Sequence, residues 1–254
     1  MSTPPAGTPL VLLNAFPVDR SQWEGLITSL ANAETVKGDI IAFDIPGIGD
    51  MPITDEDPSL ELIADAAVAA MREVTGHQAA VWVGCSMGGY IALAVAEREP
   101  TAVAGLGLIC TRATADSADE AQRRRDLADS VEDAAKHPAP RKVAEDLIGT
   151  QGPGREALVA AIEANVANHA GVAIAWGQRA MAERPDRTEV LRTVDAPAVV
   201  IIGEKDAIVP RADAELMADI LNVEPVVLAG VGHLAAFEAP DAVARALAPL
   251  FASA

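Results

Sequence analysis

The sequence predicts an α/β fold with a mainly parallel sheet of about six strands, helices on both faces and an all-helical insertion. Three observations lead to this prediction. Short apolar runs alternate with helix-length segments along most of the chain, which indicates strands joined by helical crossovers. The runs are almost continuously Val, Ile and Leu, as in strands that are buried on both faces. Between residues 112 and 191, no such run occurs.

Six apolar runs are the predicted strands. Each is bounded by Gly, Pro or Asp, which interrupt regular structure. In chain order they cover residues 10–16, 39–45, 79–85, 103–110, 198–203 and 225–229.

Helices are predicted between and after these strands. Apolar residues recur at steps of four and three from Leu60 to Val74, which places one apolar stripe on a helix. Pro58 and Ser59 precede this stripe, where the helix should begin. Further helices are predicted at residues 87–98, 212–221 and 239–251.

The segment from residue 112 to residue 191 contains charged helical stretches at 120–136 and 156–169. About 80 residues without a strand are too many for a loop. We therefore interpret residues 112–191 as a helical lid over the carboxyl-terminal edge of the sheet. Residues 1–111 and 192–254 would then form one α/β core.

The composition excludes several classes of function. The 254 residues include 19 Lys plus Arg and 37 Asp plus Glu, a formal net charge of −18, which argues against nucleic acid or an anionic membrane as a partner. Cys85 and Cys110 form neither a disulfide framework nor a metal-ligand pattern, so no metal or organic cofactor is expected. With no visible signal peptide or membrane-spanning run, we expect a cytoplasmic protein.

The third predicted strand leads directly into the sequence GCSMGG, residues 84–89. This matches the G-x-S-x-G pattern of a nucleophile elbow, with a buried strand before it and a helix after it. The tight turn requires small residues at positions 84 and 88, and it holds the Ser86 hydroxyl at a helix N-terminus, where negative charge is favoured. We expect Ser86 to be the nucleophile. We expect the Cys85 side chain to pack in the interior beside the turn and to take no part in the reaction. The alternative is an ordinary glycine-rich turn with a capping serine.

A serine nucleophile needs a base to take its proton. Of the four histidines, His233 alone follows a predicted strand, in the turn GVGHL, which would place its imidazole at the same sheet edge as Ser86. His77 precedes a strand and would lie at the opposite edge, whereas His137 and His169 belong to the insertion. His233 is therefore the predicted base.

The base must be oriented by a carboxylate. Asp206 directly follows the fifth predicted strand and lies between Ser86 and His233 in sequence, which is the expected chain order on such a sheet. Glu204 is a competitor by proximity, and Asp116 is an alternative acid in the loop after the fourth strand. We interpret both as surface charges.

Acyl transfer also requires two donors for the oxyanion. The backbone N–H groups of Met87, after the nucleophile, and Phe16, in the loop after the first strand, are the predicted pair. A substrate pocket is expected to include Asn14 from the same loop, and Trp176 and His169 from the insertion, although an aromatic side chain at position 176 is also compatible with core packing.

Five short motifs occur in order: LLNAFP at residues 12–17, DIPGIG at 44–49, GCSMGG at 84–89, GEKD at 203–206 and GHL at 232–234 with EAP at 238–240. In these motifs the chain resembles the α/β-hydrolase superfamily over nearly its whole length. Within it, the sequence is similar to the small single-lid enzymes of the 3-oxoadipate enol-lactonase and carboxylesterase type, including the stretch MAERPD at 181–186. The resemblance implies a Ser86–His233–Asp206 triad and a small ester or lactone as substrate.

Two departures from the family pattern affect the prediction. Most members have His-Gly where this chain has Asn14 and Ala15, and Ala tolerates a positive φ less well than Gly does. Members also usually begin with two additional strands, whereas only nine residues precede Leu10. We therefore expect six parallel strands without an antiparallel edge hairpin.

The predicted function is hydrolysis of a small carboxylic ester or lactone through an acyl-enzyme on Ser86. Three alternatives remain open. The same triad can support a lyase of the menaquinone-pathway type, whose acidic substrate would require arginines in the pocket, and the sequence shows no clear set of these. Cofactor-free perhydrolase or haloperoxidase chemistry is the second alternative. The third, outside enzymes, is a small-molecule receptor.

Overall fold

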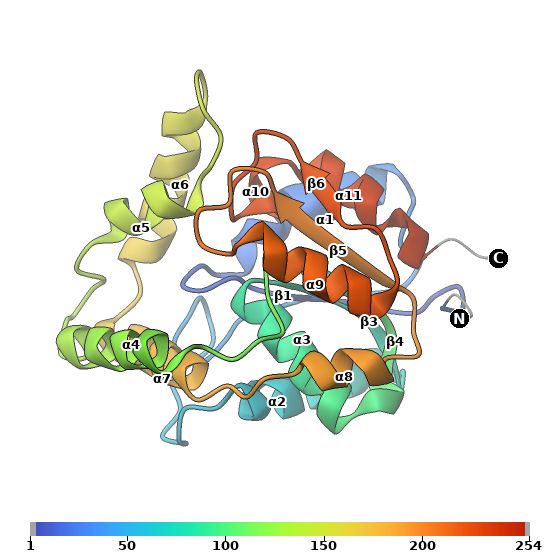
Figure 1. Ribbon diagram of the computed structural model, residues 1–254, viewed down its shortest axis with the longest axis horizontal. Helices are drawn as coiled ribbons and strands as arrows, with labels where there is room; N and C mark the ends of the chain where they lie inside the picture. Colours follow the sequence, from blue (N-terminus) through green and yellow to red (C-terminus); the bar gives the residue numbers. More distant parts are fainter. Residues whose placement is uncertain (1–3, 252–254) are drawn as a thin grey trace.

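The computed structural model describes residues 4–251, and six of its strands form one sheet in the order β2-β1-β3-β4-β5-β6 (Figure 1). Every neighbouring pair is parallel, as predicted. Leu13 pairs with Gly84, and Gly84 with Leu108, so three central strands end at a common edge. The strands are β1 Leu10–Leu13, β2 Ile40–Phe43, β3 Ala80–Cys85, β4 Val103–Ile109, β5 Ala198–Gly203 and β6 Val226–Leu228.

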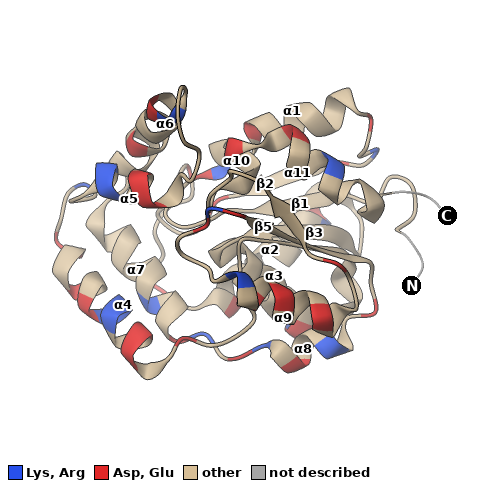
Figure 2. Cartoon of the chain, turned by 45° about the horizontal axis from the view of Figure 1, so that its top comes forward, with Lys and Arg blue, Asp and Glu red and all other residues tan. Residues whose placement is uncertain are grey.

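The sheet is buried on both faces, which explains the continuous apolar runs. Side chains alternate across a strand, so Leu10 and Leu12 pack into one hydrophobic core and Val11 and Leu13 into the other. None of the six strands contains a charged residue. Figure 2 accordingly shows the charged residues on the helices and loops that surround the strands.

Helices cover both faces. One face packs on α1 Glu24–Asn32, α10 Ala235–Glu238 and α11 Pro240–Leu247. The other packs on α2 Leu60–Thr75, α3 Met87–Arg98, α8 Thr188–Thr193 and α9 Arg211–Leu221. As predicted, α2 begins after Ser59, whose hydroxyl accepts a hydrogen bond from the Leu62 N–H. The predicted helix at 239–251 is shorter than expected: α11 ends at Leu247, and Pro249 follows in a short 3-10 turn because proline cannot extend the hydrogen-bond ladder of an α-helix.

The segment between β4 and β5 is helical, as expected. Besides α8, it contains α4 Ala118–Val131, α5 Pro140–Leu147, α6 Arg155–Ala167 and α7 Gly171–Ala182. Helices α4 and α7 pack together, as do α5 and α6, and the four lie at the left of Figure 1, away from the two chain termini. Among residues 4–251, no single helix is long and apolar enough to cross a membrane, although α6 and α7 together, bent by 99°, have the required length and composition.

Candidate active site

Ser86 lies at the tight turn between β3 and α3. Its backbone is held at φ +53° and ψ −116°, a conformation that L-residues rarely adopt. A Cβ atom on Gly84 would overlap the Gly88 carbonyl, and one on Gly88 would overlap the Leu13 carbonyl. The predicted requirement for small residues at these two positions is therefore confirmed.

Neighbouring strands hold the turn in place. The Ser86 N–H donates to the Ile109 carbonyl at 2.9 Å, and the Ser86 carbonyl accepts a hydrogen bond from the Thr111 hydroxyl at 2.7 Å. These contacts fix both sides of the Ser86 backbone. The side chain is left facing a cavity at the carboxyl end of the sheet.

His233 and Asp206 lie on loops that follow β6 and β5. The His233 Nδ1 atom is 2.9 Å from Asp206 Oδ2 and 3.0 Å from Oδ1, and both side chains are only 1% exposed. The Asp206 carboxylate also accepts hydrogen bonds from the N–H groups of Ile208 and Val209, at 2.9 and 3.1 Å. The backbone therefore orients the carboxylate, and the carboxylate orients the imidazole.

The pKa of Asp206 lies below its ordinary value. Burial alone would raise this pKa, but the contact with His233 and the hydrogen bonds from Ile208 and Val209 outweigh it. Asp206 is therefore ionised at neutral pH. An ionised carboxylate at Nδ1 leaves the Nε2 atom of a neutral His233 free to accept a proton.

The two competing acids lie elsewhere. Glu204 is exposed and accepts a hydrogen bond from the Gly230 N–H at 3.0 Å, in agreement with a surface charge. For Asp116, the expectation of a surface charge is wrong. Its side chain is 1% exposed and contacts the guanidinium groups of Arg112, Arg124 and Arg184.

Ser86 and His233 line the same cavity, which has a volume of about 310 Å³. The side chain of Phe16 forms part of its wall, together with residues of α4, α5 and α7. The cavity thus lies between the carboxyl ends of the strands and the helical segment between β4 and β5. Its volume is at the lower end of the range for small-molecule sites.

Two backbone N–H groups near Ser86 are available as donors. Met87 is the first residue of α3, so its N–H has no partner within the helix. The Phe16 N–H donates no hydrogen bond to any residue within the described range 4–251. Its neighbour Ala15, in contrast, donates to the side chain of Gln22 at 3.2 Å.

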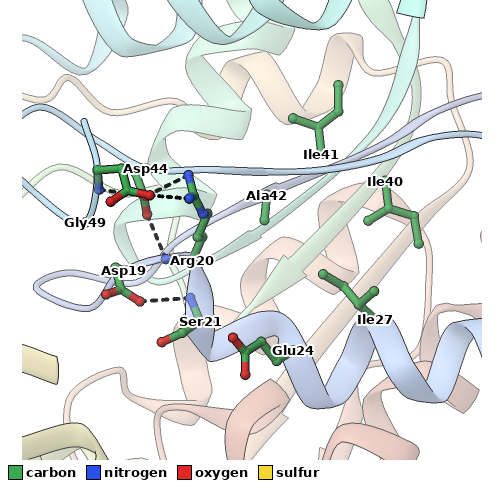
Figure 3. A pocket seen from close by; sticks show the side chains of 11 residues that line it. Asp19, Arg20, Ser21, Glu24, Ile27, Ile40, Ile41, Ala42, Asp44 and Gly49 are labelled. Carbon is green, nitrogen blue, oxygen red and sulfur yellow. Dashed lines mark hydrogen bonds and ion pairs between the residues drawn. The ribbon is translucent and has the colours of Figure 1, made fainter. Parts of the chain in front are cut away.

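Asn14 does not belong to the cavity, which corrects the expectation from sequence. Its Nδ2 donates to Asp44 Oδ1 at 2.9 Å, and its Oδ1 accepts from Trp23 Nε1 at 2.8 Å. The Asp44 carboxylate also contacts the backbone N–H and the guanidinium of Arg20 (Figure 3). Asn14 is fully buried. Its hydrogen bonds link the loop after β1 to Asp44, which follows β2.

The polar group around Asp44 borders a separate cavity of about 560 Å³ along β2 (Figure 3). Ile27 and Ile40 form part of its apolar wall, and Asp19 and Glu24 add carboxylates. This larger cavity includes none of the predicted catalytic residues.

Trp176 and His169 are also outside the cavity that contains Ser86, so both pocket predictions are wrong. The Trp176 Nε1 donates to the Glu56 carbonyl at 3.1 Å, and the ring is buried in the hydrophobic core. The His169 Nε2 lies 3.4 Å from Asn165 Oδ1 on α6. The alternative of a core role for Trp176 is correct.

Most residues that line the cavity were not predicted from the sequence, and four of them have side chains suited to binding or proton transfer. Tyr90 lies one helical turn after Ser86, Arg112 follows β4, Arg124 lies on α4, and His137 precedes α5. The expectation that the sequence offers no clear set of pocket arginines is therefore wrong. The position of Arg112 directly after a strand was a usable signal, since that strand ends at the same sheet edge as Ser86.

Cys85 and Cys110 are both buried. Burial and then the nearby Asp206 carboxylate raise the pKa of Cys85, and burial with neighbouring Cys85 raises that of Cys110. The potential ligand atoms of Cys110, Asp206 and His233 lie within 4.8 Å of one another. A thiol that remains protonated is a poor metal ligand, and the other two groups already bind each other.

Comparisons with known proteins agree with this geometry. The alpha/beta hydrolase family model matches residues 10–246. A pimeloyl-(acyl-carrier protein) methyl ester esterase of Methylococcus capsulatus is 30% identical over 226 residues, which cover 80% of this chain and 78% of the relative. A thermophilic esterase of Thermogutta terrifontis, solved with malate bound, superposes with a TM-score of 0.87 at 28% identity, covering 97% of this chain and 92% of the other.

A longer relative matches as well. The dihydrolipoyllysine-residue acetyltransferase component of the acetoin cleaving system of Pseudomonas putida is 29% identical over 241 residues. The match covers 93% of this chain but 61% of the relative. This chain therefore spans about three fifths of that protein's length.

Proposed function

Because the chain belongs to the alpha/beta hydrolase family, we propose that it hydrolyses small carboxylic esters or lactones with Ser86, His233 and Asp206 as a catalytic triad. One observation carries the proposal: Ser86, on its strained turn, and His233, bound to the buried Asp206, line a single cavity. The esterase relatives support the same reaction class.

The proposed reaction has two halves. The Ser86 Oγ attacks the carbonyl carbon while His233 Nε2 takes the hydroxyl proton, and the Phe16 and Met87 N–H groups stabilise the oxyanion. When the tetrahedral intermediate collapses, the bond to the alkoxy group breaks and His233 returns the proton to that leaving group. Water then attacks the acyl-enzyme with His233 again as base, which releases the acid and restores Ser86.

The helical segment has a part in this proposal. Residues 112–191 act as a lid, because residues of α4, α5 and α7 line the cavity that contains Ser86. Walls that reduce the access of water to this cavity strengthen the interaction between the oxyanion and its donors.

The decisive experiment replaces the nucleophile. Ser86→Ala should lower kcat for p-nitrophenyl esters by about 10⁴-fold or more, because only binding and the oxyanion donors remain. A fluorophosphonate probe should label the unaltered protein at Ser86 and leave the variant unlabelled, as followed by mass spectrometry. Retention of most activity by Ser86→Ala would refute the triad, and absence of both labelling and turnover would favour a receptor.

A further inference from the structure

We propose that the ester or lactone substrate carries a free carboxylate, which Arg112 and Arg124 bind inside the cavity that contains Ser86. This inference rests on the proposed function and specifies its substrate class. Arg112 lies just after β4, and Arg124 lies in the middle of α4. Both line the cavity together with Ser86 and His233.

The cluster around Asp116 holds more positive than negative charge. The buried Asp116 carboxylate accepts hydrogen bonds from Arg112 at 3.0 Å, Arg124 at 2.6 Å and Arg184 at 2.8 Å. The only other carboxylate paired with these arginines, among residues 4–251, is that of Glu120, 3.5 Å from Arg112. Three guanidinium groups against two carboxylates leave one net positive charge.

The other titratable groups that line the cavity do not cancel this charge. Asp146 forms an ion pair with Lys142. Burial and the nearby His169 lower the pKa of His137, so this imidazole is neutral at pH 7. The remaining groups are Tyr90, whose ring lies 4.1 Å from the Arg184 guanidinium, and His233, paired with Asp206. One excess positive charge in a protein of net charge −18 fits a carboxylate better than a doubly charged phosphate.

The two arginines also retain donors for a ligand. Arg124 uses Nε toward Asp116 and Nη1 toward Gln178, whereas its Nη2 has no hydrogen-bond partner within residues 4–251. Arg112 uses Nη2 toward Asp116 and has Nη1 3.5 Å from Glu120, and each of these nitrogens carries a second N–H. Guanidinium N–H groups form strong, charge-assisted hydrogen bonds to carboxylates.

The rest of the cavity suits the carbon chain of such a substrate. Leu127, Val131, Ile174 and Met181 contribute apolar wall. A second depression of about 310 Å³ shares Arg112, Arg124, Leu127 and Gln178 with the cavity. The arginines therefore lie where the cavity and the outer surface adjoin, so a charged group can be bound there without being fully desolvated.

The test compares matched esters with the same leaving group. Mono-p-nitrophenyl adipate and p-nitrophenyl hexanoate differ only in a terminal carboxylate or methyl group, and suberate and octanoate provide a longer pair. We expect Arg112→Gln and Arg124→Gln each to lower the anionic-to-neutral ratio of kcat/KM by about 10-fold to 100-fold, as the loss of a charge-assisted hydrogen bond implies. The neutral ester, which has no carboxylate for either arginine to bind, provides the reference kcat/KM for each variant.

Arg125→Gln is the matched control. Arg125 is adjacent on α4, is outside the cavity and pairs with Glu183, so its loss removes the same charge without changing the ratio. Arg124→Lys should restore part of the preference, because the positive charge remains. Thermal unfolding of each variant verifies the fold. None of these substitutions removes Arg184, which pairs with Asp116 at 2.8 Å.

The outcomes separate this inference from the proposed function. Suppose that Ser86→Ala abolishes turnover of both esters but the arginine variants leave the anionic-to-neutral ratio of kcat/KM unchanged. The proposed carboxylate site is then wrong, whereas the proposed hydrolase function is supported. An equal decrease of the anionic-to-neutral ratio of kcat/KM in Arg125→Gln would also refute the carboxylate site, since general electrostatic attraction would then explain the preference for the anionic ester. Failure to hydrolyse either pair, or undiminished turnover by Ser86→Ala, would overturn the proposed function and this inference with it.

Discussion

The imidazole of His233 contacts the carboxylate of Asp206 at 2.9 Å, although the two residues come from loops after different strands. β5 and β6 are neighbours in the sheet, which brings the two loops together. Because Asp206 also accepts two backbone hydrogen bonds, its position is fixed independently of His233.

Asp206→Asn should therefore reduce kcat for ester hydrolysis by about 10³-fold to 10⁴-fold. The amide cannot stabilise an imidazolium, and it favours the tautomer of His233 that lacks a free Nε2 lone pair. Glu204→Gln is the control, because Glu204 follows the same strand but is exposed. Initial rates with p-nitrophenyl acetate measure both variants. A similar loss in both would remove Asp206 from the proposed triad.

Asn14→Ala should lower stability rather than alter substrate binding. The Asn14 side chain bridges Trp23 and Asp44 in the interior, and its loss leaves the indole N–H unpaired, at a cost of about 2–3 kcal/mol. Urea unfolding measures this change. Asn168→Ala, which removes an exposed amide bound to the Ala164 carbonyl, should cost less than about 0.5 kcal/mol.

Steady-state kinetics of the same Asn14→Ala variant tests whether Asn14 lines the cavity that contains Ser86. We expect KM for p-nitrophenyl acetate to be unchanged in Asn14→Ala, because the side chain faces the β2 edge. A raised KM without loss of stability would instead restore the substrate-binding role that the sequence suggested.

The sheet was predictable because each strand is marked by a pattern of consecutive residues in the sequence. Each strand is an unbroken apolar run, and burial on both faces requires that pattern, as Leu10 to Leu13 illustrate. The Ser86 turn was equally local, since Gly84 and Gly88 lie within two residues of it and only glycine fits there. His233 and Asp206 followed from their places after two strands that end at one edge.

The cavity wall was less predictable because it depends on side-chain direction and distant pairing. Asn14 lies in the correct loop but faces Trp23 and Asp44, which no sequence spacing indicates. Asp116 looked like a surface charge, yet one of its partners, Arg184, is 68 residues away in the chain. Such a cluster becomes visible only after the helices between β4 and β5 are packed.

The two cysteines should be inert toward alkylating reagents in the folded protein. Burial raises the pKa of both thiols, so little thiolate is present at pH 8 to react. Incubation with iodoacetamide followed by intact mass measurement should show no adduct under native conditions and two adducts in urea. Rapid native labelling at Cys85 would contradict the interpretation of this residue as packing in the turn.

Asp116→Asn should destabilise the protein in a pH-dependent manner. Burial would raise the pKa of Asp116, but hydrogen bonds and charges from Arg184 and Arg124 hold it below the ordinary value of 3.8. A carboxyl group with a lowered pKa in the folded state stabilises the fold above the unfolded-state pKa, and this contribution disappears as the pH falls through the folded-state pKa. Replacement should thus cost about 3 kcal/mol near pH 7.

The difference in unfolding free energy between Asp116→Asn and the unaltered protein should shrink as the pH falls from about 5 to about 2, because both proteins then have a neutral group at position 116. Urea unfolding at several pH values measures it. Asp126→Asn, at an exposed position on α4, should remain within about 0.5 kcal/mol of the unaltered protein throughout. A cost for Asp116→Asn that does not vary with pH would show that packing, rather than the carboxylate charge, holds the three arginines together.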